Sequence, residues 1–341
     1  MNLSNLDYSI MPLKKKCKST PQITLGLSMH RPEMIPLIEE WMHRHDTIFL
    51  EEPPESNFRP MLRGEVSIDD YLMTLDLEYP AFSRMMYRLL RELHATGKKI
   101  YQIEPFLEVL LSIHELFAEG RTPDDLPRNS LQWPVYRAER EATGALLAYY
   151  RVAMQGSFEK TVNAILKFAQ ADAARFRLRD SLRAQALAPL LKKYRSAYIE
   201  AGVIHFQLWR LLRQKLQTPD RVRPVFLADN ALKKMKESGQ LYGPGDKLTL
   251  LYIFHPTIAE TEQHRLLAAR AIIYSKIIEK QEIVSDRNNF PHLRDELHCI
   301  RTTRNLSLQD CRKLFTLIRR AKTSEARQIV ADHLYRQTET I

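Results

Sequence analysis

Five short apolar runs that alternate with helical patterns are the feature that most constrains the fold of this chain. The runs lie at residues 22–29, 46–54, 99–106, 196–206 and 221–228. They are rich in β-branched and aromatic residues, as is typical of buried strands. Strands that alternate with helices form parallel sheets, because each helix returns the chain to the same edge of the sheet. The sequence therefore predicts an α/β fold with a mostly parallel sheet flanked by helices.

A large helical insertion is expected before the fourth strand. Residues 104–195 are rich in Ala, Leu, Arg and Gln and contain few glycines, a composition that favours helices. Prolines at residues 122–134 indicate a connection, and Gly156-Ser157 indicates a turn between two helices. Beyond residue 228 helical patterns continue, although residues 243–249 (GPGDKLT) are expected to form a β-turn before an apolar run.

These patterns divide the chain into three parts. We expect a flexible basic N-terminus at 1–20, an α/β domain at 21–228, and a mainly helical C-terminal extension at 229–341.

The composition indicates a globular protein with a basic surface. The 341 residues are 44% hydrophobic, which is ample for a core, and the formal net charge is +10. A basic surface favours acidic partners such as nucleic acid. However, the Lys and Arg residues are spread along helices, and one dense run, residues 14–16, lies in the expected N-terminal tail. Nucleic acid is therefore the less favoured partner.

The cysteines and apolar stretches indicate a cytoplasmic protein. Cys17, Cys299 and Cys311 have no CxxC spacing, so they predict neither a disulfide framework nor a structural zinc site. No apolar stretch has the length of a signal peptide or of a membrane span. The sequence leaves the oligomeric state open.

Ionisable residues stand at the carboxyl ends of four predicted strands. These residues are His30, Glu51 with Glu52, Glu104 and His205. In a parallel sheet, ligands bind at this edge, because the loops there vary freely and helix N-termini are close. A single histidine or glutamate at a strand end is usually a loop residue or a helix cap. Several ionisable residues at the ends of neighbouring strands together predict a functional site.

Two kinds of chemistry fit such a cluster. In the first, His30, Glu51 and His205 hold a divalent metal, such as manganese, cobalt or zinc, that activates water. In the second, no metal is present, and a histidine oriented by a carboxylate acts as a general base toward water.

Four motifs resemble a known superfamily. They are LGLSMH at 25–30, LEEP at 50–53, RFRLRDSLRA at 175–184 and GVIH at 202–205. Their order is similar to that in the group that contains the TraB and Tiki proteins, the ChaN-like lipoproteins and the erythromycin esterases. The resemblance covers residues 22–228. It implies an α/β domain of this kind, with peptidase or esterase activity in some members.

The resemblance also implies which residues form the site. They are His30, Glu51 or Glu52, Arg179 and His205, with Asp180 adjacent. The first motif departs from the GxxH pattern of the group. Its glycine, Gly26, comes one position early, with Leu27 and Ser28 at the positions that the group gives to glycine and to Glu or Thr.

The arginines around this motif have different expected roles. A guanidinium at Arg179 is suited to an oxyanion or to a substrate carboxylate or phosphate. Arg175, Arg177 and Arg183 are expected to form the exposed face of the same helix.

The sequence thus predicts a hydrolase that acts on a small molecule or peptide. The alternative is a non-enzymatic binding protein for an anionic ligand or nucleic acid, whose affinity would depend steeply on salt.

Overall fold

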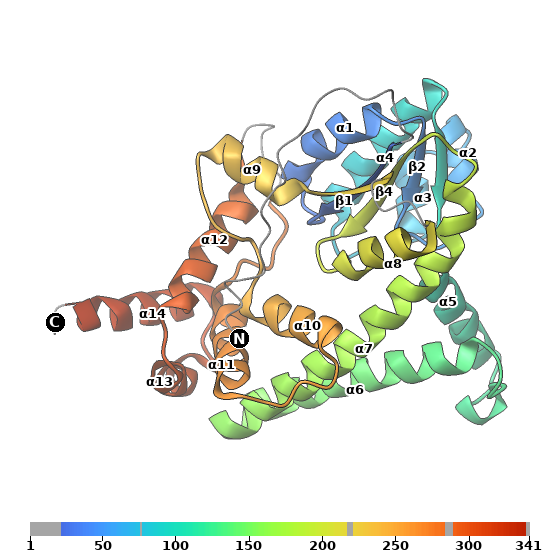
Figure 1. Ribbon diagram of the computed structural model, residues 1–341. Coiled ribbons are helices and arrows are strands. Elements are labelled where there is room, and N and C mark those ends of the chain that lie inside the picture. The colour runs from blue at the N-terminus through green and yellow to red at the C-terminus, as the bar shows by residue number, and fades with distance from the viewer. Residues whose placement is uncertain (1–21, 76, 217–220, 284–288, 339–341) are drawn as a thin grey trace.

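The computed structural model describes residues 22–75, 77–216, 221–283 and 289–338 (Figure 1). Within these residues, five strands form one parallel sheet in the order β3-β2-β4-β1-β5. The strands are β1 (Gln22–Ser28), β2 (Thr47–Leu50), β3 (Lys99–Gln102), β4 (Ser196–Gly202) and β5 (Val222–Phe226). The predicted parallel α/β fold is confirmed, and each apolar run contains one strand.

Helices fill every connection between the strands. Between β1 and β3 they are η2 (Pro32–Met34), α1 (Ile35–His43), α2 (Phe58–Arg63), α3 (Ile68–Met73) and α4 (Pro80–Ala95). Between β3 and β5 they are α5 (Pro105–Ala118), η3 (Pro123–Asp125), α6 (Gln132–Gln155), α7 (Phe158–Leu191) and α8 (Phe206–Leu216). After β5 they are α9 (Leu227–Met235), α10 (Pro244–Phe254), α11 (Glu262–Ile277), α12 (Pro291–Arg304), α13 (Leu308–Ile318) and α14 (Thr323–Thr338).

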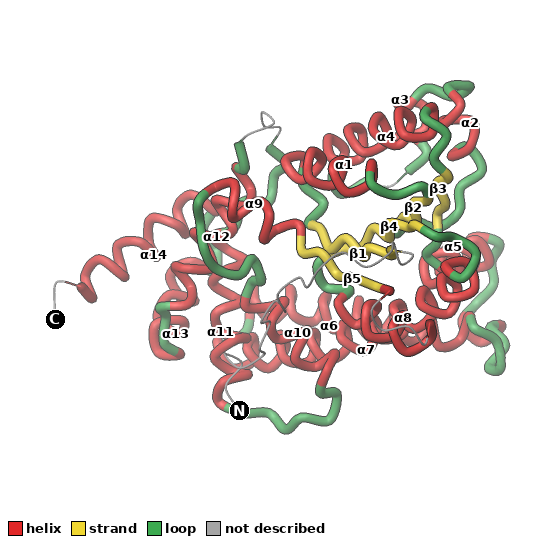
Figure 2. The backbone as a smooth tube through the Cα atoms, turned by 45° about the horizontal axis from the view of Figure 1, so that its top comes forward, coloured by secondary structure: helices red, strands yellow, loops and turns green. Residues whose placement is uncertain are grey.

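Helices cover both faces of the sheet. Helices α1 to α4 lie over one face, while α8 and the second half of α7 lie over the other (Figure 2). Side chains alternate between the faces as strand geometry requires. In β2, for example, Ile48 and Leu50 belong to the core under α1 and α4, whereas Phe49 packs on the α7 side. The residue after β2, Glu51, therefore follows the direction of Phe49.

The helical insertion and the C-terminal helices share one core. Gly156 and Ser157 join α6 to α7, as predicted, and the Ser157 side chain accepts the backbone N–H of Lys160. Along α7, Val162 packs in one cluster with residues of α10, α11 and α13. The second half of α7 packs on the sheet. This single long helix connects the two parts of the molecule, as Figure 1 shows.

The predicted β-turn at residues 243–249 is wrong, because this segment begins a helix. Pro244 occupies the first turn of α10, where its missing N–H leaves no donor unpaired. The Asp246 carboxylate accepts the backbone N–H of Gly243 at 2.9 Å, which caps the helix. The apolar residues that follow are buried against α7 and α11.

The early glycine of the first motif has a steric cause. Gly26 lies in β1, and the Tyr198 side chain from the neighbouring strand β4 lies across it. A Cβ atom on Gly26 would stand 2.0 Å from the Tyr198 hydroxyl oxygen. Tyr198 is itself fully buried, so it has no space into which to move. Only glycine fits at this position.

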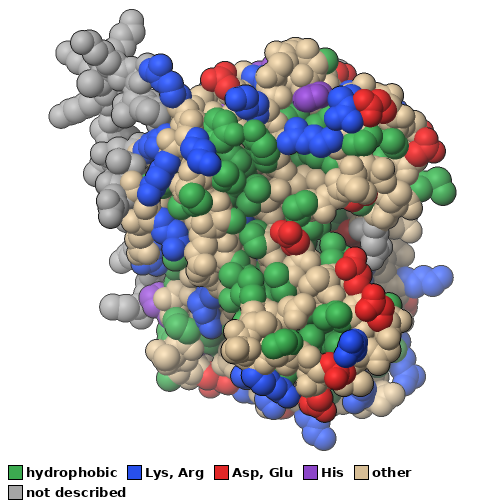
Figure 3. All heavy atoms as spheres, turned by 90° about the vertical axis from the view of Figure 1, so that its right-hand side faces the viewer, with side chains coloured by type: hydrophobic (Ala, Val, Ile, Leu, Met, Phe, Trp, Pro, Cys, Tyr) green, Lys and Arg blue, Asp and Glu red, His purple; other side chains and the backbone are tan. Residues whose placement is uncertain are grey.

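Four further features concern the predictions made from composition: membrane spans, cysteines, the N-terminus and surface charge. None of the helices in the described ranges combines the length and apolar character needed to cross a bilayer. Cys299 and Cys311 are buried and free. The expected basic N-terminus and Cys17 lie outside the described residues. On the face in Figure 3, side chains of both charges occur with apolar side chains between them.

We predict that Gly26→Ala lowers the free energy of unfolding by about 1–3 kcal/mol, because the new methyl group overpacks against Tyr198. Gly144→Ala is the control, since Gly144 lies on α6 with open space around its Cβ position. That change should raise stability by about 0.5–1 kcal/mol. Denaturant unfolding measures both variants, and equal stability of the two would contradict the steric explanation.

Candidate functional site

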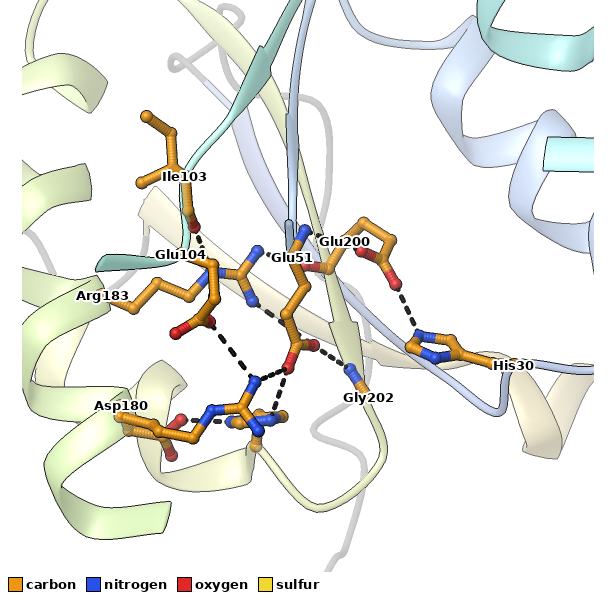
Figure 4. Close-up of polar contacts among 10 residues, drawn as sticks. His30, Glu51, Ile103, Glu104, Asp180, Arg183, Glu200 and Gly202 are labelled. Atoms are coloured by element: carbon orange, nitrogen blue, oxygen red, sulfur yellow. Dashed lines mark hydrogen bonds and ion pairs between the residues drawn. The ribbon is translucent and has the colours of Figure 1, made fainter. Parts of the chain in front are cut away.

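The carboxyl ends of four strands meet at one edge of the sheet, as the sequence predicts. Figure 4 shows Glu51 at the centre of this edge, with His30 and Glu200 on one side and two arginines on the other. Glu200 lies within β4, while the other residues follow their strands or come from α7. The site thus has two halves that meet at Glu51.

The Glu51 carboxylate is held by several donors. Its Oε1 lies 2.7 Å from His205 Nε2 and 3.0 Å from Arg179 Nη2, and its Oε2 accepts the backbone N–H of Gly202 at 2.7 Å. Burial raises the pKa of Glu51, but the charges of His205 and the two arginines outweigh burial and hold the pKa well below its usual value. Glu51 is therefore a fixed carboxylate anion.

His205 bridges two carboxylates. Its Nδ1 lies 2.5 Å from Asp180 Oδ1, and its Nε2 contacts Glu51. Burial lowers the pKa of His205, but the negative charges of Glu51 and Asp180 outweigh it and raise the pKa to about 9. At neutral pH the imidazolium donates from both nitrogens, so neither has a lone pair for a metal or for a proton from water. In this arrangement His205 orients Glu51.

Two arginines of α7 enter the site beside Glu104. Arg179 Nη2 lies 3.6 Å from Glu104 Oε2, and Arg183 Nε lies 3.9 Å from the same oxygen. Glu104 is completely buried, and burial raises its pKa despite the two guanidinium groups. The two arginines thus compensate the charges of two carboxylates, Glu51 and Glu104, and Glu104 is the residue that precedes α5.

The expectation that Arg183 is exposed is wrong. Its side chain is fully buried, and it donates to the backbone carbonyls of Ile103 at 3.0 Å and of Glu200 at 2.7 Å. These carbonyls follow β3 and belong to β4, so one guanidinium joins two strand ends. Arg175 is half-buried too, because it pairs with Glu139.

His30 and Glu200 form the second half of the site. His30 Nε2 lies 2.9 Å from Glu200 Oε1, and Glu200 Oε2 accepts the backbone N–H of Glu51 at 2.9 Å. The His30 ring stacks on Phe82 from α4, and 36% of its side chain is exposed. Burial lowers the pKa of His30, but the Glu200 carboxylate outweighs it and raises the pKa.

Among the described residues, His30, Glu51 and Glu200 form a group that could hold a metal ion. One potential ligand atom from each residue lies within 4.8 Å of the others. The sequence interpretation named His30, Glu51 and His205, and it missed Glu200. A signal was present, because Glu200 is the one charged residue in the buried run AYIEAG.

Glu52 lies beside this group without belonging to it. Its carboxylate accepts the Tyr87 hydroxyl at 3.0 Å and the Gln102 amide N–H at 2.9 Å. Burial raises the pKa of Glu52 to about 6, and the nearby charge of Glu200 adds to the shift. Glu52 is therefore able to exchange a proton near neutral pH.

The chain is similar to an archaeal protein. It is 30% identical over 287 residues to a protein of the archaeon Archaeoglobus fulgidus that is described as an uncharacterized protein, and the match covers 84% of this chain and 94% of the archaeal protein. No family model matches the chain. No solved structure matches it.

We predict that the stability contributed by His205 is lost at alkaline pH. The pKa is raised from 6.5 to about 9 in the folded protein, so this contribution is complete below pH 6.5 and disappears as pH rises through about 9. Denaturant unfolding from pH 6 to 10 should show a fall that is weaker in His205→Gln. Identical pH profiles for the two proteins would contradict the ion-pair assignment.

We predict that Arg183→Met lowers the free energy of unfolding by about 3–5 kcal/mol, because the buried Glu51 and Glu104 lose a compensating charge. Arg177→Met is the matched control on the same helix. Arg177 donates one hydrogen bond to the Tyr252 carbonyl, so about 1 kcal/mol is expected. The two values come from denaturant unfolding, and similar losses would argue against a special role of Arg183.

Proposed function

The chain belongs to the family of this Archaeoglobus fulgidus protein, and from its own site we propose that it is a hydrolase. The observation that carries the proposal is the group formed by His30, Glu51 and Glu200 at the carboxyl edge of the sheet. The resemblance of the strand-end motifs to those of the TraB, ChaN-like and erythromycin esterase group supports the same proposal.

The three residues suit a divalent cation such as manganese, cobalt or zinc. One imidazole nitrogen and two carboxylates are ligands that these ions accept. Their potential ligand atoms lie within 4.8 Å of one another, and His30 is partly exposed, which leaves a path for an ion. When bound, such an ion supplies Lewis-acid activation of water.

The surrounding residues orient Glu51 and handle protons. His205, Arg179 and the Gly202 N–H fix the Glu51 carboxylate, so it does not have to reorganise when a ligand binds. Glu52, with its pKa of about 6, is the group proposed to take up a proton from water. Arg179 places positive charge where an oxyanion would develop on the substrate.

The substrate class follows from the same groups. A carbonyl or phosphoryl bond fits an arginine beside a water-activating centre. We therefore propose an ester or peptide bond in a small molecule or peptide as the target. Without the metal, His30 with Glu200 would remain as a histidine base oriented by a carboxylate.

We predict that the protein binds Mn²⁺, Co²⁺ or Zn²⁺ and that Glu200→Gln weakens binding by about 10- to 100-fold or more. Glu104→Gln is the matched control, since Glu104 is equally buried in the same site but lies outside the group. Isothermal titration calorimetry with untagged, chelator-treated protein measures the affinities.

Hydrolysis of ester, peptide and phosphoester chromogenic substrates is then compared in wild type and Glu51→Gln. A metal-dependent activity that Glu51→Gln abolishes supports the proposal. If the wild type binds none of the three ions, the proposed metal site is wrong. If no substrate is cleaved with or without metal, the hydrolase proposal is wrong.

A further inference from the structure

A cavity of about 290 Å³ lies between the α/β part and the C-terminal helices. Arg31 and Tyr79 line it from the segments before η2 and α4, while Asp246, Tyr274 and Glu296 line it from α10, α11 and α12. Arg31 directly follows His30 in the chain. One residue that lines the cavity thus adjoins a residue of the candidate metal-binding group in the chain, but none of the lining residues belongs to that group.

The lysine and arginine side chains that line the cavity are those of Lys280, which is exposed, and Arg31. Its guanidinium lies over the Tyr79 ring, 4.4 Å from the ring centroid. Its Nη1 is shielded from solvent and has no hydrogen-bond partner within the described ranges. A buried guanidinium nitrogen without an acceptor is costly, so a ligand oxygen at this position would be favourable.

Five carboxylates line the cavity. They are Glu78, Glu279 and Asp295, of which Asp295 pairs with Arg327, together with Asp246 and Glu296. Asp246 accepts the N–H of Gly243, and Glu296 accepts the Tyr274 hydroxyl at 3.1 Å. Within the part of the chain that the structure describes, no lysine or arginine forms an ion pair with either carboxylate. Burial raises the pKa of Glu296 to about 7, and the neighbouring Asp246 adds to this shift. Neither carboxylate therefore has a cation in direct contact among the described residues, although Lys247 acts on Asp246 from a greater distance.

Arg31 does not neutralise these carboxylates by direct contact. It forms no ion pair within 4.0 Å of any described residue, although its charge lowers the pKa of Glu296. Cavity space therefore separates the Arg31 guanidinium from these two carboxylates. A molecule that carries both charges, in the opposite order, would complement both walls.

We propose that this cavity binds a small zwitterion, with the ligand carboxylate on Arg31 and its ammonium group on Asp246 and Glu296. The volume fits an amino acid or a comparably small compound. Tyr79 and Tyr274 supply aromatic walls on which the ligand's aliphatic part packs.

The walls of the cavity are held together before a ligand binds. The Glu33 carboxylate accepts the backbone N–H groups of His292 and Leu293 at the start of α12. In the other direction, Glu282 accepts the N–H groups of Ala81 and Phe82 at the start of α4. Each part of the molecule thus caps a helix of the other, so a ligand would bind to a preformed site.

The test is isothermal titration calorimetry of the full chain with a panel of amino acids. The panel contains the twenty free L-amino acids and ω-amino acids from glycine to 6-aminohexanoate. Each compound that binds is compared with the matching carboxylic acid, which lacks the ammonium group, and with the matching amine. We expect the single-charge analogues to bind about 10- to 100-fold more weakly.

Two variants remove one wall each. Arg31→Gln and Glu296→Gln should each weaken binding by about 10- to 100-fold. Arg294→Gln, which changes an exposed arginine of α12 outside the cavity, should leave the affinity unchanged. The glutamine in Glu296→Gln can still accept from Tyr274, so this variant is expected to fold.

Three results would overturn the proposal. The first is that no compound of the panel binds. The second is that the amine or the acid alone binds as tightly as the zwitterion, which would indicate a site for one charge. The third is that both cavity variants bind like the wild type. The metal titration is a separate measurement, so failure here does not affect the proposed hydrolytic site.

Discussion

The parallel pairing of β4 between β1 and β2 is the constraint on which the candidate site depends. In this register Glu200 of β4 stands opposite Gly26 of β1. Its carboxylate therefore reaches both His30, after β1, and the backbone N–H of Glu51, after β2. With β4 in this position, one side chain joins these two strand ends.

Burial of charge explains why one half of the site is rigid. Several ionised groups lie in the interior between α7 and the sheet, and burying each would be costly without a partner. The buried guanidinium of Arg183 donates hydrogen bonds to two backbone carbonyls. His205 lies between the carboxylates of Glu51 and Asp180 and compensates their charge. The other half, with His30, is partly exposed. The buried half of the site is thus held by ion pairs and hydrogen bonds, whereas the His30 half is accessible to solvent.

The C-terminal helices are part of the same structure rather than an appendage to it. They share a core with the first half of α7, and α12 also packs in the core under α1 and α4. Glu33 and Glu282 then connect the two parts through helix caps in both directions. Such contacts join residues far apart in the chain, so no local sequence pattern predicts them.

Local patterns in the sequence determined the five strands and most of the helices, and the tertiary structure decided which side chains work together. The five strands, the turn at Gly156-Ser157 and the strand-end positions of His30 and Glu51 follow from periodicity and turn chemistry, which act over a few residues. The order of the strands, the inclusion of Glu200 and the burial of Arg183 depend on long-range pairing. A charged residue in a strand or on a helix has the same local pattern whether it faces solvent or a buried partner, so only the packed fold distinguishes the two.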